Sequence, residues 1–190
     1  MIYVPHPQGD IANAADYGRR AMTRILFHVL SLFLLQAPVY SGIPASCDIP
    51  LINAAGGPPV RLSALKEKVV LVYFWTTNCV PCRIHKPFIE ELQKRYGDRS
   101  FAVQSVNTGE KPDAVMKYLK SHPTTLSVAL DPSGTLERAL LLVGQPAMAL
   151  FVADGGLLWS AAGFGPSTRD DLVWRIENYL PAKPASADKR

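Results

Sequence analysis

Hydrophobic and polar positions along the chain alternate as expected for strands and helices that follow one another. The strongest strand pattern, Val69–Trp75, is an unbroken run of β-branched and aromatic residues without a charge. Such a run is typical of a strand that is buried on both faces, so it belongs in the middle of a sheet. The next segment, Ile84–Tyr96, has apolar residues at helical spacing and predicts a helix that ends at Gly97.

The remainder of the chain continues this alternation of strands and helices. The pattern predicts strands at Phe101–Val106 and Leu126–Leu130, helices at Asp113–Lys120, Ser133–Leu142 and Thr168–Leu180, and a hairpin of Ala147–Ala153 with Leu157–Ala162. We expect Ser133 or Gly134, and Thr168, to cap the last two helices. Strands that alternate with helices pack most simply as parallel strands with crossover helices on both faces. The fold class is therefore α/β, with a central mixed sheet whose antiparallel edge is the hairpin.

A short turn, Thr76–Asn78, joins the central strand to two cysteines, Cys79 and Cys82. Residues three apart lie on one helical face, so the two sulfurs can bond if Cys79 occupies the cap of the helix. The positive end of the helix dipole lowers the pKa of a cysteine there from about 8.5, which makes Cys79 a nucleophile. Cys82 lies a turn further in, where we expect it to be buried and able to attack a mixed disulfide on Cys79. Pro81 suits the first turn because it lacks an N–H.

The motif FWTTNCVPC, together with Arg83 and Pro87, resembles the active site of the thioredoxin-like superfamily. More narrowly, it is similar to the extracytoplasmic TlpA/ResA/DsbE disulfide oxidoreductases. The resemblance spans residues 49–180 and includes the stretches Pro50–Lys68, Ser105–Glu110, Leu126–Gly134 and Gly144–Val152. It implies a thioredoxin-like fold with a short N-terminal hairpin extension before the central strand.

The resemblance also implies a function, that of a thiol-disulfide oxidoreductase acting on protein thiols or disulfides outside the cytoplasm. Members of this family mostly act as reductants, in cytochrome c maturation or on copper-site thiols, and a membrane electron donor recharges them. Cys79 would then attack and Cys82 would resolve. Pro146, if in cis, would present its neighbouring backbone to the partner chain, and Trp75 counts among the supporting residues. The resemblance implies no cofactor and no resident metal.

Three positions depart from the family pattern: Asn78 replaces Trp, Gln145 replaces Val, Leu or Thr, and His85 replaces an acidic residue. His85 lies one turn after Cys82 on the same helical face. A neutral imidazole does not repel a thiolate as a carboxylate does, and a charged imidazole would stabilise it. We therefore expect His85 to favour the Cys79 thiolate. The alternative is that His85 points to solvent beside Lys86.

Other interpretations of the cysteine pair are less favourable. A structural disulfide across two residues closes so small a loop that it constrains the unfolded chain little. A zinc site built on Cys79, Cys82 and His85 needs a fourth ligand, and the chain has three cysteines in all, with no second pair. A copper-binding or metal-delivery module that uses the same cysteines is the alternative function.

The first part of the chain predicts export. Arg24 precedes the apolar run Ile25–Leu35, which is typical of a secretory signal and is shorter than the roughly 20 residues of a spanning helix. The predicted location is periplasmic or extracytoplasmic, either soluble after cleavage or tethered by residues 25–35. A lipid on Cys47 is a further alternative.

The predicted organisation is one domain at 47–181, preceded by an extension with a signal or anchor at 1–46 and followed by a disordered tail at 182–190. The chain has 190 residues and a formal net charge of +4. Arginines near the signal segment and basic residues of the tail carry most of this excess. The domain itself is close to neutral, which argues against a nucleic-acid surface.

Overall fold

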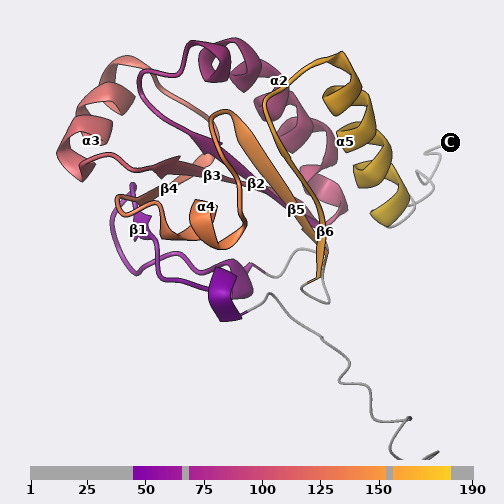
Figure 1. The fold of residues 1–190 in the computed structure, drawn as a ribbon, viewed down its shortest axis with the longest axis horizontal. Helices are drawn as coiled ribbons and strands as arrows, with labels where there is room; N and C mark the ends of the chain where they lie inside the picture. The colour runs from indigo at the N-terminus through magenta and orange to yellow at the C-terminus, as the bar shows by residue number, and fades with distance from the viewer. Residues whose placement is uncertain (1–44, 66–68, 153–155, 181–190) are drawn as a thin grey trace, which may run out of the picture. The chain divides into compact units, whose positions relative to one another are not determined.

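The computed structural model describes residues 45–65, 69–152 and 156–180. In this part of the chain six strands form one mixed sheet in the order β1-β4-β3-β2-β5-β6 (Figure 1). The strands are β1 (Ile52–Asn53), β2 (Val69–Trp75), β3 (Phe101–Thr108), β4 (Ser127–Asp131), β5 (Ala147–Val152) and β6 (Leu157–Ala162). β2 is parallel to β3 and antiparallel to β5, and β5 pairs antiparallel with β6. The predicted mixed sheet with an antiparallel hairpin edge is confirmed.

Helices cover both faces of this sheet, as predicted. The helices are α2 (Val80–Tyr96), α3 (Pro112–Ser121), α4 (Thr135–Ala139) and α5 (Pro166–Tyr179), with short 3-10 turns η1 (Ala45–Cys47), η2 (Leu62–Ala64) and η3 (Gly97–Arg99). One core cluster joins the sheet to α2, α3 and α5. The other joins the opposite face to α4 and to the segment that contains η1 and η2 (Figure 1).

Burial on both faces explains why the central strand β2 has no polar position. Val69, Leu71, Tyr73 and Trp75 point into the cluster beneath α2 and α5. The alternate residues Val70, Val72 and Phe74 point into the cluster on the face of α4. Every residue of β2 is at most 8% exposed, so both faces of the strand select apolar side chains.

The active-site helix begins at Val80, directly after the predicted cap Cys79, and runs to Tyr96. Its buried side comprises Cys82, Ile89, Leu92 and Tyr96. Ile84, which was expected to face the core, is 68% exposed. Ile84 lies two residues beyond the buried Cys82, which is a rotation of about 200° around the helix, so its side chain faces away from the core.

One predicted helix cap is confirmed and one is wrong. α4 is shorter than Ser133–Leu142, but its N-cap is Gly134, one of the two predicted positions. The Asp131 carboxylate accepts the Leu136 N–H at 2.8 Å and the Ser133 hydroxyl at 3.0 Å. α5 begins at Pro166 instead of at a Thr168 cap, since the fixed φ of proline suits the first helical turn.

The predicted N-terminal hairpin is reduced to a single antiparallel bridge between Leu51 and Val60. Backbone hydrogen bonds of 2.9 Å in both directions close it. The adjoining strand β1 pairs with β4 at the edge of the sheet. The predicted signal segment, the C-terminal tail and residues 153–155 of the β5–β6 turn lie outside the described residues. Among the residues that are described, no helix is long and apolar enough to cross a membrane.

Candidate active site

The loop after β2 delivers Cys79 to the first position of α2. Cys79 is the N-cap, with extended backbone angles, and its Sγ accepts the Cys82 N–H at 3.0 Å. The two cysteines form a disulfide across a Cα–Cα distance of 5.2 Å. Pro81 lies in the first turn, where its missing N–H costs no helical hydrogen bond. The predicted cap position of Cys79 is confirmed.

The two cysteines differ slightly in exposure in this oxidised state, 9% for Cys79 and 4% for Cys82. Cys82 lies against the sheet, and its backbone carbonyl accepts the Tyr73 hydroxyl at 3.0 Å. Burial, with a smaller contribution from Tyr118, raises the pKa of Tyr73 well above its ordinary value. The Tyr73 phenol therefore stays protonated and serves as a donor that holds the first turn of α2 to the sheet.

Pro146 lies at the same end of the sheet as the cysteines. The Gln145–Pro146 peptide bond is cis. Ala147, which follows it, pairs with Phe74 near the end of β2. The chain before β5 therefore meets the loop that leads to Cys79. The Gln145 side chain points back to α4, where it donates to the Glu137 carboxylate at 2.8 Å.

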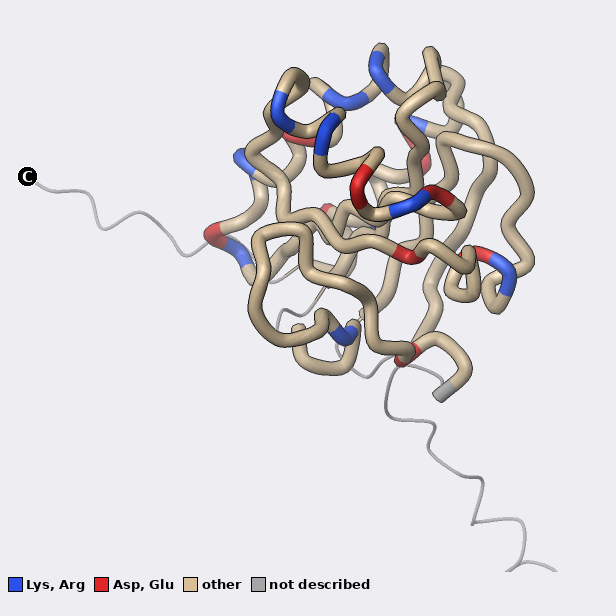
Figure 2. The backbone as a smooth tube through the Cα atoms, turned by 90° about the vertical axis from the view of Figure 1, so that its left-hand side faces the viewer, with Lys and Arg blue, Asp and Glu red and all other residues tan. Residues whose placement is uncertain are grey.

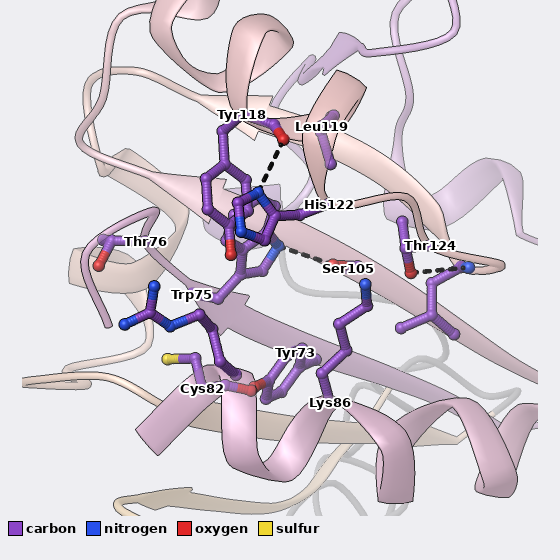
Figure 3. Close-up of a pocket in the computed structure, with 12 residues that line it drawn as sticks. Tyr73, Trp75, Thr76, Cys82, Lys86, Ser105, Tyr118, Leu119, His122 and Thr124 are labelled. Atoms are coloured by element: carbon purple, nitrogen blue, oxygen red, sulfur yellow. Dashed lines mark hydrogen bonds between the residues drawn. The ribbon is translucent and has the colours of Figure 1, made fainter. Parts of the chain in front are cut away.

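A pocket opens beside Cys82, between α2 and α3 (Figure 3). Trp75 lies in its wall, where its indole N–H donates to Ser105 Oγ at 2.7 Å and its ring lies 5.7 Å from that of Tyr118. The other lining residues are Tyr73, Thr76, Arg83, Lys86, Leu119, His122, Thr124 and Leu126. The pocket thus combines aromatic walls with cationic side chains from α2, next to the cysteine that is predicted to resolve.

His85 packs on a neighbouring aromatic ring and remains partly exposed. Its ring is partly buried against Phe164, with ring centroids 4.3 Å apart. Burial lowers the pKa of His85 below its ordinary value, and the Arg169 guanidinium lowers the pKa further. Both effects favour the neutral form of the imidazole. Because the folded pKa is below the unfolded one, the contribution of His85 to stability is complete above about pH 6.5 and is lost as the pH falls through the folded pKa.

A neutral His85 leads to a specific expectation for the cysteines. Replacing His85 with Glu should raise the pKa of the Cys79 thiol, because a carboxylate repels a thiolate. Replacing it with Ala should leave that pKa close to the wild-type value at neutral pH. Thiolate absorbance against pH, with redox equilibration against glutathione, measures both effects. If all three proteins titrate and equilibrate alike, His85 has no part in the cysteine chemistry.

Comparison with known proteins identifies the family. The redoxin family matches residues 41–173. The chain belongs to the redoxin family. Thiol-disulfide oxidoreductase ResA of Bacillus cereus is 25% identical to this redoxin over 171 residues, which cover 83% of this chain and 98% of the relative.

Solved structures agree with this assignment. A structure from Chlorobium tepidum described as thiol:disulfide interchange protein DsbE is 31% identical, with a TM-score of 0.64, and the match covers 70% of this chain and 92% of that one. The exposed lipoprotein thioredoxin Etrx1 of Streptococcus pneumoniae is 28% identical, with a TM-score of 0.61, over 69% of this chain and 98% of that one. The fold is thioredoxin-like, and this redoxin is a thiol-disulfide oxidoreductase.

The copper-delivery alternative has no comparable observation in its favour. Within the described part of the chain, no group of three His, Cys, Asp or Glu side chains lies close enough together to hold a metal ion. The domain was also expected to be close to neutral. In agreement, Asp and Glu lie among Lys and Arg along the backbone (Figure 2).

Sequence reasoning missed several residues that hold the site together. Tyr73 was treated only as part of a buried strand, although its hydroxyl contacts Cys82. Asn107 and Glu110 were noted only for their resemblance to the end of a family strand, yet Glu110 bonds to the loop before Cys79 and Asn107 bonds to Trp75, the last residue of β2. The available signal was topological, because the carboxyl ends of the parallel strands β2 and β3 lie at the same edge of the sheet.

Proposed function

We propose that this redoxin reduces disulfide bonds in partner proteins outside the cytoplasm, with Cys79 as the nucleophile and Cys82 as the resolving thiol. The observation that carries the proposal is the Cys79–Cys82 disulfide at the start of α2, with Cys79 as the N-cap. An N-cap thiolate accepts helix N–H groups and interacts with the positive end of the dipole, both of which favour its charged form. The relatives named ResA and DsbE support the same chemistry.

The reaction needs two thiol–disulfide exchanges. In the first, the Cys79 thiolate attacks one sulfur of the partner disulfide, and the other partner sulfur leaves as a thiolate. In the second, Cys82 loses its proton and attacks Cys79 Sγ, so that the second partner sulfur leaves and the Cys79–Cys82 bond forms. The partner gains two electrons and this redoxin loses two. An external dithiol, which we assign to a membrane electron donor, restores the reduced pair.

Exposed apolar side chains around the cysteines favour a protein as the substrate. Val80 and Ile84, on the first turns of α2, are 53% and 68% exposed. Leu141 and Val143, on the chain that leads to Pro146, are 89% and 86% exposed. Large exposed apolar side chains on the cysteine helix and on the chain before Pro146 are typical of a surface that contacts another protein. We propose apocytochrome c or a copper-site protein as the partner class.

Turnover of a protein disulfide tests directly whether this redoxin acts as a reductant or as an oxidant. Reduced protein, supplied with a chemical electron donor, should reduce insulin faster than the donor alone. The pre-oxidised protein without a donor should not introduce disulfides into a reduced, unfolded substrate. The opposite pattern, oxidation of the reduced substrate without reduction of insulin, would contradict the proposed direction.

We also propose that residues 47–181 form the catalytic domain and that residues 1–46 direct its export. The basic and apolar segment at Arg24–Leu35 supports export. Cys47 is 3% exposed within a core cluster, which disfavours a lipid on its sulfur because the acyl chains would have to displace core side chains. Fusing residues 1–50 to a reporter that is active only outside the cytoplasm should give a signal. A silent reporter with intact fusion protein in the cytosol would exclude export.

A further inference from the structure

The Glu110 carboxylate holds the loop that precedes Cys79. Its Oε2 accepts the backbone N–H of Thr77 at 2.7 Å, and its Oε1 accepts the Thr77 hydroxyl at 2.6 Å. Thr77 lies in the short turn between β2 and Cys79, where the Cys79 N–H also bonds to the Thr76 carbonyl at 3.2 Å. One carboxylate therefore fixes both the backbone and the side chain of this turn.

Glu110 is itself anchored to the sheet through Asn107. The Asn107 side-chain amide donates to Glu110 Oε2 at 2.6 Å and to the Trp75 carbonyl at 3.3 Å. Asn107 is 0% exposed and lies in register with Trp75, the last residue of β2. Its Oδ1 has no hydrogen-bond partner among the described residues. The amide is thus oriented toward these two acceptors, although a buried oxygen without a partner is unfavourable.

We propose that Glu110 is a positioning residue for the thiol–disulfide reaction. Asn107 anchors Glu110, and Glu110 holds Thr77, which keeps Cys79 at the N-cap of α2. The stabilisation of a Cys79 thiolate depends on that position, because the dipole effect falls off within the first turn and the Cys82 N–H reaches Sγ only from the cap. A looser turn allows Cys79 to leave the cap, so the pKa of its thiol rises. This inference rests on the proposed function, since it assigns Glu110 a part in the same reaction.

The charge of Glu110 by itself acts in the opposite direction. A carboxylate near a thiolate raises the thiol pKa, so removing only its charge would lower that pKa. Thr77→Val separates the two effects, because it deletes the hydroxyl bond to Glu110 and leaves the carboxylate in place. Under the proposal, Glu110→Ala and Thr77→Val both raise the pKa of the Cys79 thiol.

The chain contains a matched control for stability. Glu90 accepts the Thr124 hydroxyl at 2.7 Å and the Thr125 backbone N–H at 3.2 Å, so it makes the same kind of carboxylate–threonine contact as Glu110. Glu90 lies eight residues after Cys82 on α2, a rise of about 12 Å along the helix. Glu90→Ala should cost stability comparable to that lost in Glu110→Ala, but it should leave the Cys79 pKa unchanged.

The experiment measures the rate of iodoacetamide alkylation of Cys79 against pH in the reduced full-length proteins, with peptide mapping, and the stability of each protein in denaturant. We expect Glu110→Ala and Thr77→Val to raise the Cys79 pKa, by about one unit in Glu110→Ala. Alkylation of Glu110→Ala below that pKa should then slow about threefold, since the higher nucleophilicity of the more basic thiolate offsets part of the tenfold loss of thiolate. The double variant should be no worse than Glu110→Ala, because the two residues form one contact.

An unchanged or lowered Cys79 pKa in Glu110→Ala and Thr77→Val would overturn the proposal, and so would an equal rise in Glu90→Ala. Failure of this proposal can be distinguished from failure of the proposed function. The Cys79 pKa is measured without any protein substrate, whereas failure of the proposed function would appear as absent insulin reduction by the wild-type protein.

Discussion

Replacing Cys82 with serine should trap this redoxin on its substrate. The reduced variant retains Cys79, which attacks a partner disulfide, but it has no second thiol to release the partner, so a mixed disulfide accumulates. Cys79→Ser should form no such adduct, because Cys82 is held against the sheet and is 4% exposed. Insulin reduction should fall in both variants to the rate measured without protein.

Non-reducing electrophoresis and mass mapping of the adduct measure this prediction. Cys47→Ala serves as the control, since Cys47 lies in the core cluster on the opposite face of the sheet and should leave turnover unchanged. Accumulation of an adduct on Cys82 in the Cys79→Ser variant, with none on Cys79 in Cys82→Ser, would reverse the assigned roles.

The second large effect concerns stability. Phe74 is 0% exposed near the end of β2, the central strand, and packs into the cluster on the α4 face. Phe74→Ala should lower the free energy of unfolding by about 3–5 kcal/mol, the range found when a buried aromatic ring is replaced by a cavity. Such a loss is a large fraction of the stability of a typical domain.

Denaturant unfolding of the oxidised protein measures this loss. Trp174→Ala is the matched control, because that aromatic side chain on α5 is 59% exposed and its removal should change stability by about 0.5 kcal/mol or less. Similar losses in the two variants would contradict the assignment of β2 as the centre of the core.

Local sequence patterns predicted the parts of the fold that depend on local physics. The uncharged run at β2 indicated a strand buried on both faces, and two cysteines after a turn indicated a helix cap. The contact of Asp131 with the first turn of α4 could not be predicted in this way, because Asp131 belongs to the preceding strand. Ile84 was misplaced because it lies two residues, or about 200° of rotation, beyond the buried Cys82 on the helix.

The sequence also predicted only part of the candidate site. Cys79, Cys82 and the cis Pro146 followed from the motif and its resemblance to a family. The contacts of Glu110 with Thr77 depend on residues 33 positions apart in the chain, which meet because β2 and β3 are parallel and end together. Periodicity within one segment carries no information about such a contact. The packing of His85 on Phe164 is likewise set by the tertiary fold.

We propose that Cys79 and Cys82 form a redox couple that donates electrons to protein disulfides. The reduction potential of the full-length protein, measured by equilibration with glutathione buffers and thiol trapping, tests it most directly. We expect one reversible two-electron couple on Cys79 and Cys82 with a potential below about −200 mV, on the reducing side of protein disulfide isomerase at about −180 mV. A disulfide that resists all glutathione ratios while the protein stays folded and fails to reduce insulin, or a potential near the −120 mV or so of a strong oxidant such as DsbA, would contradict it.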